Sequence, residues 1–155
     1  MKERISYQEL PNGLYESLKH VQHFLDQNDL SPTLKGLIKM RVSQINSCAY
    51  CIDMHYKEAV HAGETPLRLI SLTAWREAPY YSAKEEAVLE FAEMLTHLPA
   101  EQHSDGIHDK LKTHFSQAEI AMLTLEVIQI NSWNRLVRSF GLIAGKYEIH
   151  ESSKN

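Results

Sequence analysis

Cysteine is nearly absent from this sequence: its 155 residues include only Cys48 and Cys51, three positions apart. A scaffold held by several disulfides is therefore excluded. Long apolar runs are also absent, and without about 18 consecutive apolar residues no membrane-spanning helix is predicted. The first residues, MKERISYQEL, lack the apolar segment of a signal peptide. We therefore expect a cytoplasmic protein with no membrane partner, in which a structural disulfide is not expected.

An excess of charge of one sign is likewise missing, because the formal net charge is only −4 and acidic and basic residues are mixed. The lack of a basic stripe argues against a nucleic-acid partner. No glycine-rich loop follows a strand pattern, so no nucleotide or flavin cofactor is expected. Apolar residues make up 43% and charged residues 23%, which is typical of a globular protein. We expect residues 1–155 to form a single domain.

Strand-like alternation of apolar and polar residues is also lacking, and apolar residues instead recur at the three- and four-residue steps of a helix. N-cap residues, prolines at first helical positions, capping boxes and glycine stops mark several helices. The first predicted helix starts after Gly13, the second starts at Ser31-Pro32, and the third extends from the cysteines to Gly63. A short helix is predicted from Thr65-Pro66 through Leu72. Two further helices are predicted, one from Ser82 to before Pro99 and one from Ser116 to Gly141. These signals predict an all-α bundle of roughly seven or eight helices. A polar loop is expected after Pro99, and a frayed polar tail after Lys146.

The stretch IAMLTLEVIQI, residues 120–130, is apolar on nearly all sides, which is typical of a central buried helix. Such a helix is either fully wrapped or packs in part against another subunit. Glu126 is out of place within it, because burying a carboxylate is costly unless it is paired. We expect Glu126 to face solvent or to pair at a subunit contact; the alternative is that it reaches a functional site. Asn131 and Asn134 predict buried hydrogen bonds between helices.

The two cysteines lie in NSCAYCIDMH, residues 46–55, and their spacing suits redox chemistry. Residues three apart on a helix have Cβ atoms about 5–6 Å apart, near the range in which a disulfide closes. His55 lies one turn after Cys51 but about two turns after Cys48. A base beside a thiol promotes the thiolate, so His55 favours Cys51 as the attacking thiol and Cys48 as the resolving thiol. The helix dipole instead favours Cys48 as the more exposed thiol of lower pKa.

Two alternatives compete with a redox pair. Cys48, Cys51 and His55 offer three ligands to zinc, but a structural zinc site normally has four, and no other cysteine is present. The second alternative is that both cysteines are inert buried thiols, but His55 would then have no function beside them. A metal-free dithiol is therefore the preferred interpretation, with a zinc-binding module as a weaker one.

Three stretches resemble the alkylhydroperoxidase AhpD-like branch of the carboxymuconolactone decarboxylase family over about residues 30–142: KMRVSQINSCAYCIDMHYKEAVHAGET, LTAWREAPYYSAKEEAVLEFAEMLT and LTLEVIQINSWNRLVRSFG. The resemblance implies an all-helical homo-oligomer, a dimer, trimer or hexamer, that reduces hydroperoxides through a redox-active disulfide. It implies that Cys51 attacks the peroxide, Cys48 resolves the sulfenic acid and His55 relays the proton. The implied reductant is an external dithiol, such as a lipoyl-bearing or thioredoxin-like protein.

One position departs from the family pattern, in which a glutamate twelve residues before the first cysteine orients the histidine. Here that position is Gly36. Glu126 is a candidate substitute, and Arg41 is a candidate to stabilise a thiolate, although a salt bridge is the alternative role for Arg41. The missing glutamate leaves open a second function, a slow or non-enzymatic redox-sensing module with a reversible Cys48–Cys51 disulfide.

Overall fold

The computed structural model describes residues 2–101 and 105–149, and no strand occurs among them. The prediction of an all-α fold is confirmed. The elements are the 3₁₀ helices η1 (Tyr7–Glu9) and η2 (Leu72–Ala74) and the seven α-helices α1 (Leu14–Asp26), α2 (Pro32–Ile45), α3 (Ala49–His61), α4 (Pro66–Ser71), α5 (Ala83–His97), α6 (Asp105–Lys112) and α7 (Gln117–Phe140).

The helix starts follow the capping signals of the sequence. The Ser31 side chain accepts a hydrogen bond from the Leu34 amide and caps α2. Ser82 and Ser116 form the predicted capping boxes of α5 and α7. Each cap satisfies amides that have no partner inside the helix, which sets where the helix begins.

The predicted polar loop after Pro99 is wrong in its second half, where the chain forms α6. Ile107 and Leu111 lie one helical turn apart and are both buried, against α5 and α7. Two apolar residues are enough to fix a short helix once neighbouring helices cover them, but they give little signal in a polar sequence. The helix is thus stabilised by tertiary packing rather than by its own pattern.

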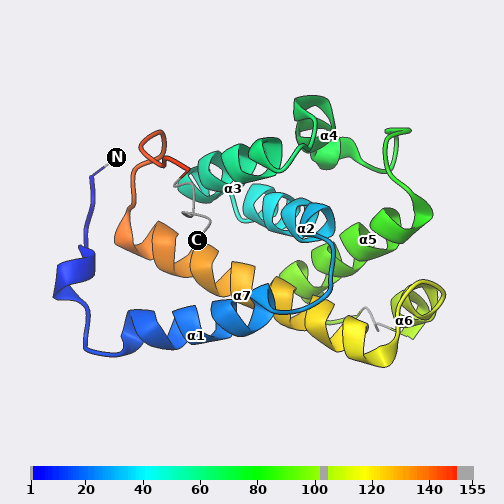
Figure 1. Ribbon diagram of the computed structural model, residues 1–155, viewed down its shortest axis with the longest axis horizontal. Helices are drawn as coiled ribbons and strands as arrows, with labels where there is room; N and C mark the ends of the chain where they lie inside the picture. Colours follow the sequence, from blue (N-terminus) through cyan, green and yellow to red (C-terminus); the bar gives the residue numbers. More distant parts are fainter. Residues whose placement is uncertain (1, 102–104, 150–155) are drawn as a thin grey trace, which may run out of the picture.

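Helix α2 lies at the centre of the molecule and packs against α3, α5 and α7 (Figure 1). Helix α1 runs alongside α7, and α6 covers the far ends of α5 and α7. The main core joins α2, α5, α6 and α7, and a second apolar cluster joins α2, α3, α4, η2 and α5. None of the helices in the described ranges has the length and hydrophobicity needed to cross a membrane.

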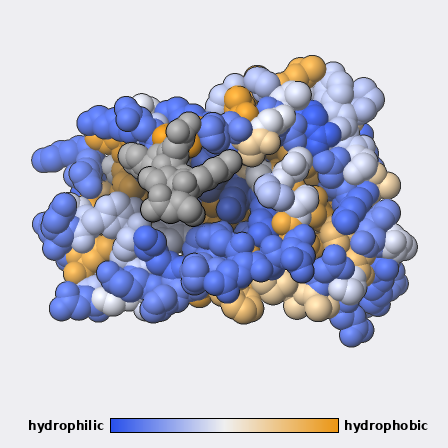
Figure 2. Space-filling view, viewed as in Figure 1, coloured by the Kyte–Doolittle hydropathy of each residue, from blue (hydrophilic) through white to orange (hydrophobic). Residues whose placement is uncertain are grey.

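Helix α7 is buried along most of its length but not all round. Its Ile128 is 53% exposed and lines a shallow groove with Leu98 and Leu95 from the end of α5. Figure 2 shows a largely hydrophilic face on which apolar side chains form small separate patches, one of them over α4. These patches do not test the predicted homo-oligomer, which stays a prediction.

Asparagines tie the turn between α2 and α3 to α7, as the sequence predicted. The Asn46 side-chain amide donates to Asn131 Oδ1 at 2.9 Å and to Asn134 Oδ1 at 3.0 Å. Asn134 is fully buried and donates in turn to Ser43 Oγ at 3.2 Å. These bonds hold Ser47 at a positive φ of 51°, and α3 begins directly after it.

Phe91→Ala is expected to lower the free energy of unfolding by about 3–5 kcal/mol, because Phe91 is 1% exposed and its removal leaves a cavity in the main core. Urea unfolding measures the change. Phe24→Ala is the matched control, since Phe24 is 57% exposed and its loss should cost less than about 1 kcal/mol. Equal losses in the two variants would contradict this account of the core.

Candidate active site

The two cysteines stand at the beginning of α3 and are joined by a disulfide, with Cα atoms 5.3 Å apart. Cys48 is the N-cap residue, and Cys51 lies in the first turn. They are 1% and 2% exposed, so exposure favours neither cysteine as the attacking thiol. Val137 of α7 packs against both cysteines. Cys51, but not Cys48, lines the cavity described next.

A cavity of about 410 Å³ lies beside the disulfide, bounded mainly by α1, α3 and α7. This volume falls within the ~300–1,000 Å³ of typical small-molecule sites. Helix α7 contributes one continuous face at steps of three and four residues. The lining residues are Tyr7, Tyr15, Lys19, Gln22, Asp26, Lys39, Tyr50, Cys51, Met54, His55, Glu58, Glu126, Ile130, Trp133, Val137 and Tyr147.

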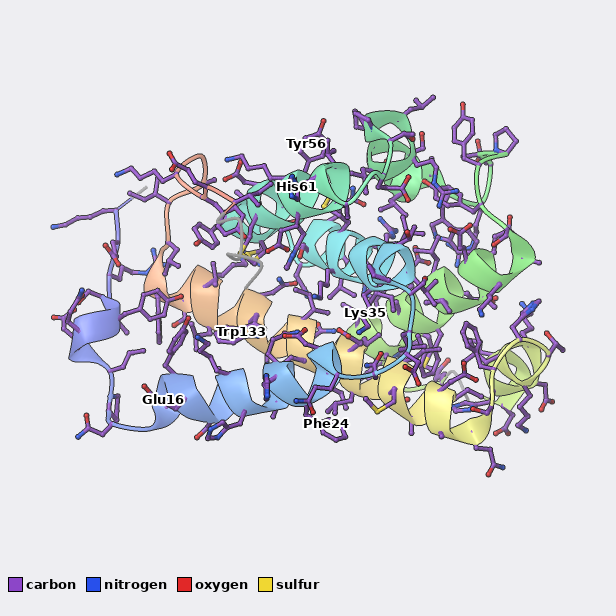
Figure 3. The ribbon with its side chains drawn as sticks, viewed as in Figure 1. Glu16, Phe24, Lys35, Tyr56, His61 and Trp133 are labelled. Carbon is purple, nitrogen blue, oxygen red and sulfur yellow. A yellow bond between two sulfur atoms is a disulfide. The ribbon has the colours of Figure 1, made fainter. Side chains whose placement is uncertain are left out.

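Aromatic side chains form the wall of the cavity on the side of α1. The rings of Tyr15 and Trp133 meet edge to face with centroids 5.8 Å apart, and Tyr7 packs on Tyr15 at 5.0 Å. Figure 3 places Trp133 between α7 and α1. Burial raises the pKa of Tyr7 to about 12, so its hydroxyl stays protonated. The aromatic part of this wall is therefore apolar in its body with a neutral Tyr7 hydroxyl, and α1 adds Lys19, Gln22 and Asp26 to the lining.

His55 is held by a carboxylate on its own helix. Its Nδ1 lies 2.8 Å from Glu58 Oε2, and the Tyr147 hydroxyl donates to Glu58 Oε1 at 2.8 Å. Glu58 follows His55 by three residues, which places the two side chains on one face of α3. The three groups form a continuous hydrogen-bonded chain that ends at the imidazole.

Burial lowers the pKa of His55, which is 6% exposed, and the Glu58 carboxylate only partly offsets this effect. The neutral imidazole is therefore favoured at neutral pH. With a proton on Nδ1 shared with Glu58, the other nitrogen, Nε2, is left as a proton acceptor. Burial alone would raise the pKa of Glu58, but the hydrogen bonds from His55 and Tyr147 bring it below its usual value.

Glu58 was not predicted from the sequence, although its spacing from His55 carried the signal. The family pattern that the sequence resembles has its glutamate at position 36, which is Gly36 in this chain. In the structure, a Cβ at Gly36 would lie 3.7 Å from the Ala59 side chain, where α2 and α3 meet. Gly36 lines a second depression together with His55 and Glu58. The carboxylate near His55 thus comes from α3, not from α2.

The prediction of a frayed tail after Lys146 is wrong for the residues that follow directly. Lys57 of α3 donates to the Tyr147 carbonyl at 2.9 Å, and the Gly145 amide donates to Asp53 of α3 at 2.9 Å. This segment carries the Tyr147 hydroxyl to Glu58. The rest of the predicted tail, residues 150–155, lies outside the described residues.

Glu126 does not face solvent, because α7 packs there against α1 and α2 and leaves it only 1% exposed. It lines the same cavity as Cys51 and His55, but the carboxylate bonded to His55 is Glu58, so the role of Glu126 as the substitute glutamate stays a prediction. Its buried Oε1 has no hydrogen-bond partner among the described residues. Burial raises the pKa of the Glu126 carboxyl, and the positive charges of Lys39 and Lys35 only partly oppose this effect.

Arg41, the other candidate for a supporting role, lies away from the cavity. Its guanidinium pairs with Glu93 of α5 at 2.6 Å, so the salt bridge is its role in this structure. Glu93 also accepts a hydrogen bond from Trp75 and pairs with Arg76. Within the described ranges, no group of three or more His, Cys, Asp or Glu side chains is arranged to hold a metal ion.

Comparison with known proteins gives a family and a fold. A family model, the carboxymuconolactone decarboxylase family, matches residues 10–94. The uncharacterized protein YdfG of Bacillus subtilis is 38% identical over 142 residues, which cover 91% of this chain and 96% of that protein.

Several solved structures are similar to this one. A protein of unknown function from Agrobacterium tumefaciens, described as a candidate antioxidant defence protein AhpD, has 32% identity and a TM-score of 0.88 and covers 94% of this chain and 100% of that chain. An uncharacterized peroxidase-related protein from Silicibacter has 22% identity and a TM-score of 0.75, covers 84% of this chain and 70% of that chain, and shares the fold.

Glu126→Gln is expected to remove a pH dependence of stability. Because the folded-state pKa of Glu126 lies above the ordinary 4.5, the folded protein holds this proton more tightly than the unfolded chain does. The stabilisation is complete below about pH 4.5 and is lost as the pH rises through the folded-state pKa. Across that window it changes by up to about 1.4 kcal/mol per pH unit.

Urea unfolding of both proteins between about pH 4.5 and 8 tests this effect. The stability of Glu126→Gln relative to wild type should increase with pH. Glu90→Gln, which alters an acid on the surface of α5 paired with Lys110, is the matched control. A difference between Glu126→Gln and wild type that does not change with pH would contradict the assignment.

Proposed function

This chain belongs to the carboxymuconolactone decarboxylase family, and we propose that it is a thiol peroxidase of the AhpD-like type that reduces organic hydroperoxides. The observation that carries the proposal is the position of Cys51, whose side chain lines a cavity together with His55. The hydrogen bond of His55 to Glu58 fixes the imidazole and leaves Nε2 free to take a proton. A relative described as a candidate AhpD antioxidant defence protein supports the same class of reaction.

In the proposed cycle, Nε2 of His55 takes the proton of the Cys51 thiol. The thiolate attacks one oxygen of the hydroperoxide, the O–O bond breaks, and the leaving alkoxide takes the proton from His55. The products are an alcohol and the sulfenic acid of Cys51. The Cys48 thiol then attacks this sulfur and releases water, which gives the Cys48–Cys51 disulfide.

An external dithiol returns the pair to the reduced state by thiol–disulfide exchange and becomes a disulfide itself. A lipoyl-bearing or thioredoxin-like protein is the expected donor. The two electrons that reduce the peroxide thus come from this donor, and the cysteines are unchanged after one cycle. Both sulfurs are almost fully buried in the disulfide form. The donor therefore needs either a narrow thiol-bearing group that can reach the buried disulfide, or a local unfolding of the first turn of α3 that exposes it.

Glu58 and Tyr147 are positioning residues in this proposal. Glu58 holds the tautomer of His55 and stabilises the imidazolium while the proton is on it. Tyr147 keeps a hydrogen bond on Glu58, and burial with that bond raises the pKa of Tyr147 to about 12, so it remains a donor. The alternative of a slow redox sensor was based on Gly36. Because Glu58 supplies a carboxylate to His55, the missing glutamate at position 36 is a weaker argument for a slow sensor.

Exchange of the two cysteines for serine tests their roles. Cys51→Ser should lower the rate of hydroperoxide consumption by at least about a hundredfold, because the attacking sulfur is gone. Cys48→Ser should still react with one equivalent of peroxide and then stop at the sulfenic acid, which a dimedone-type reagent traps. Stopped-flow kinetics and mass spectrometry measure both steps. The reverse pattern would show that the helix dipole determines the attacking thiol.

Changes at Glu58 test the proton relay. Glu58→Ala should lower kcat/KM roughly tenfold or more, because His55 loses its orientation. Glu58→Gln keeps a hydrogen-bonding oxygen and should lose less. Since the carboxylate raises the pKa of His55, both variants should lower that pKa and shift the acid limb of the pH–rate profile to lower pH. Glu90→Gln on the surface serves as the control, and an unshifted profile in both Glu58 variants would count against the relay.

A further inference from the structure

The proposed reaction uses one end of the cavity and leaves the other end unexplained. Val137 of α7 packs against the cysteines, whereas Glu126 precedes it by eleven residues on the same helix. At 1.5 Å per residue, these positions are about 16 Å apart along the axis. Along α7, Glu126 therefore lies about three turns from the residue that packs with the cysteines. A polar group at this distance can contact the distant part of a larger molecule.

The far end contains a buried acid without a partner. Glu126 is 1% exposed, and its Oε1 lacks a hydrogen bond within the part of the chain that the structure describes. Leaving a buried polar atom unpaired costs about 1–3 kcal/mol, so such atoms normally indicate a missing partner. Burial favours the neutral carboxyl, which is a hydrogen-bond donor.

Lys39 of α2 lies between Glu126 and the His55–Glu58 pair, because its charge acts on the pKa of all three groups and it lines the second depression with His55 and Glu58. Lys39 also lines the cavity and forms no ion pair with any residue in the described ranges. The neighbouring Lys35 lies near the end of α1 (Figure 3). Its ammonium already donates to the carbonyls of Leu25 and Asn28. Asp26 lies nearby, but the two lysines affect Glu126 more strongly than Asp26 does.

Between the two ends the walls from α7 and α3 are apolar, while α1 contributes Lys19 and Gln22 to the lining. Ile130 and Trp133 continue the face of α7 that begins at Glu126, and Met54 lies opposite on α3. Trp133 is supported from behind by Tyr15. A planar or chain-like hydrocarbon body matches such walls, because burial of apolar surface is the main source of its affinity.

We propose that this cavity binds an organic substrate whose carboxylate lies between Lys39 and Glu126 and whose apolar body lies along Ile130 and Trp133, with the reacting group at Cys51. The assignment of the reacting group rests on the proposed function, and the substrate class is then a carboxylate-bearing organic hydroperoxide. Lys39 provides the charge, and the Glu126 carboxyl donates the second hydrogen bond. The two groups are specificity-determining residues and take no part in the transfer of electrons.

Binding of two probes without a peroxide group tests the proposal. 2-Naphthoate and its neutral analogue 2-naphthamide have nearly the same shape, and titration calorimetry on the disulfide form measures their affinities. Wild type should bind naphthoate at least about tenfold more tightly than naphthamide, as expected for a charge-assisted pair of hydrogen bonds. Equal affinities, or no binding of either probe, would overturn the proposal.

Variants locate the preference within the cavity. Lys39→Met keeps the length of the side chain without its charge and should reduce the preference for naphthoate to about twofold or less. Glu126→Leu removes the donor and should weaken naphthoate binding by at least about tenfold, whereas Glu126→Gln keeps a donor and should stay within about threefold of wild type. Lys112→Met on the surface of α6 is the matched control and should bind like wild type. Retention of the full preference by Lys39→Met would overturn the proposal.

The binding test is independent of turnover. If the cysteine variants contradict the peroxidase cycle while the naphthoate preference holds, the carboxylate site stands and the proposed reaction is wrong. If peroxide is consumed but the preference is absent, the reaction stands and the substrate class is wrong. Thermal melting of each variant confirms that it is folded, and Glu126→Gln supplies a readout if Glu126→Leu does not fold.

Discussion

The site depends on the hydrogen bonds that fix the turn between α2 and α3 to α7. Asn46, Asn131, Asn134 and Ser43 satisfy one another in the interior, where an unpaired amide would be costly. They set the point at which α3 begins, and therefore the direction in which its first turn presents the cysteines. Because α7 also forms the opposite wall of the cavity, the same bonds fix the position of that wall relative to Cys51. The asparagines that hold the turn and the residues that form this wall of the cavity therefore belong to the same helix, α7.

From that fixed start, the geometry of α3 arranges most of the chemistry. Cys51, His55 and Glu58 follow at steps of four and three, so they share the face that borders the cavity. The charges near His55 are set by burial first and by Glu58 second, which leaves a neutral imidazole held in one orientation. The remaining helices supply what one helix cannot, namely aromatic walls, a cover from Tyr147 and the polar far end.

Local features were predictable from the sequence, and features that depend on packing were not. Ser31, Ser82 and Ser116 act on amides a few residues away, so their caps could be read directly. The relation of His55 to Cys51 was equally local. Glu126 could not be placed, because its burial depends on how α7 packs against α1 and α2. Tyr147 could not be placed either, since ninety residues separate it from Lys57, whose ammonium holds its carbonyl.

The contact between Gly36 and Ala59 acquires a mechanical meaning from the position of Glu58. When a histidine and its carboxylate are on different helices, any sliding of one helix past the other changes their separation. Here both belong to α3, so α2 and α3 can shift against each other without disturbing the pair. In this chain the carboxylate bonded to His55 comes from α3, so residue 36 needs only to fit against Ala59.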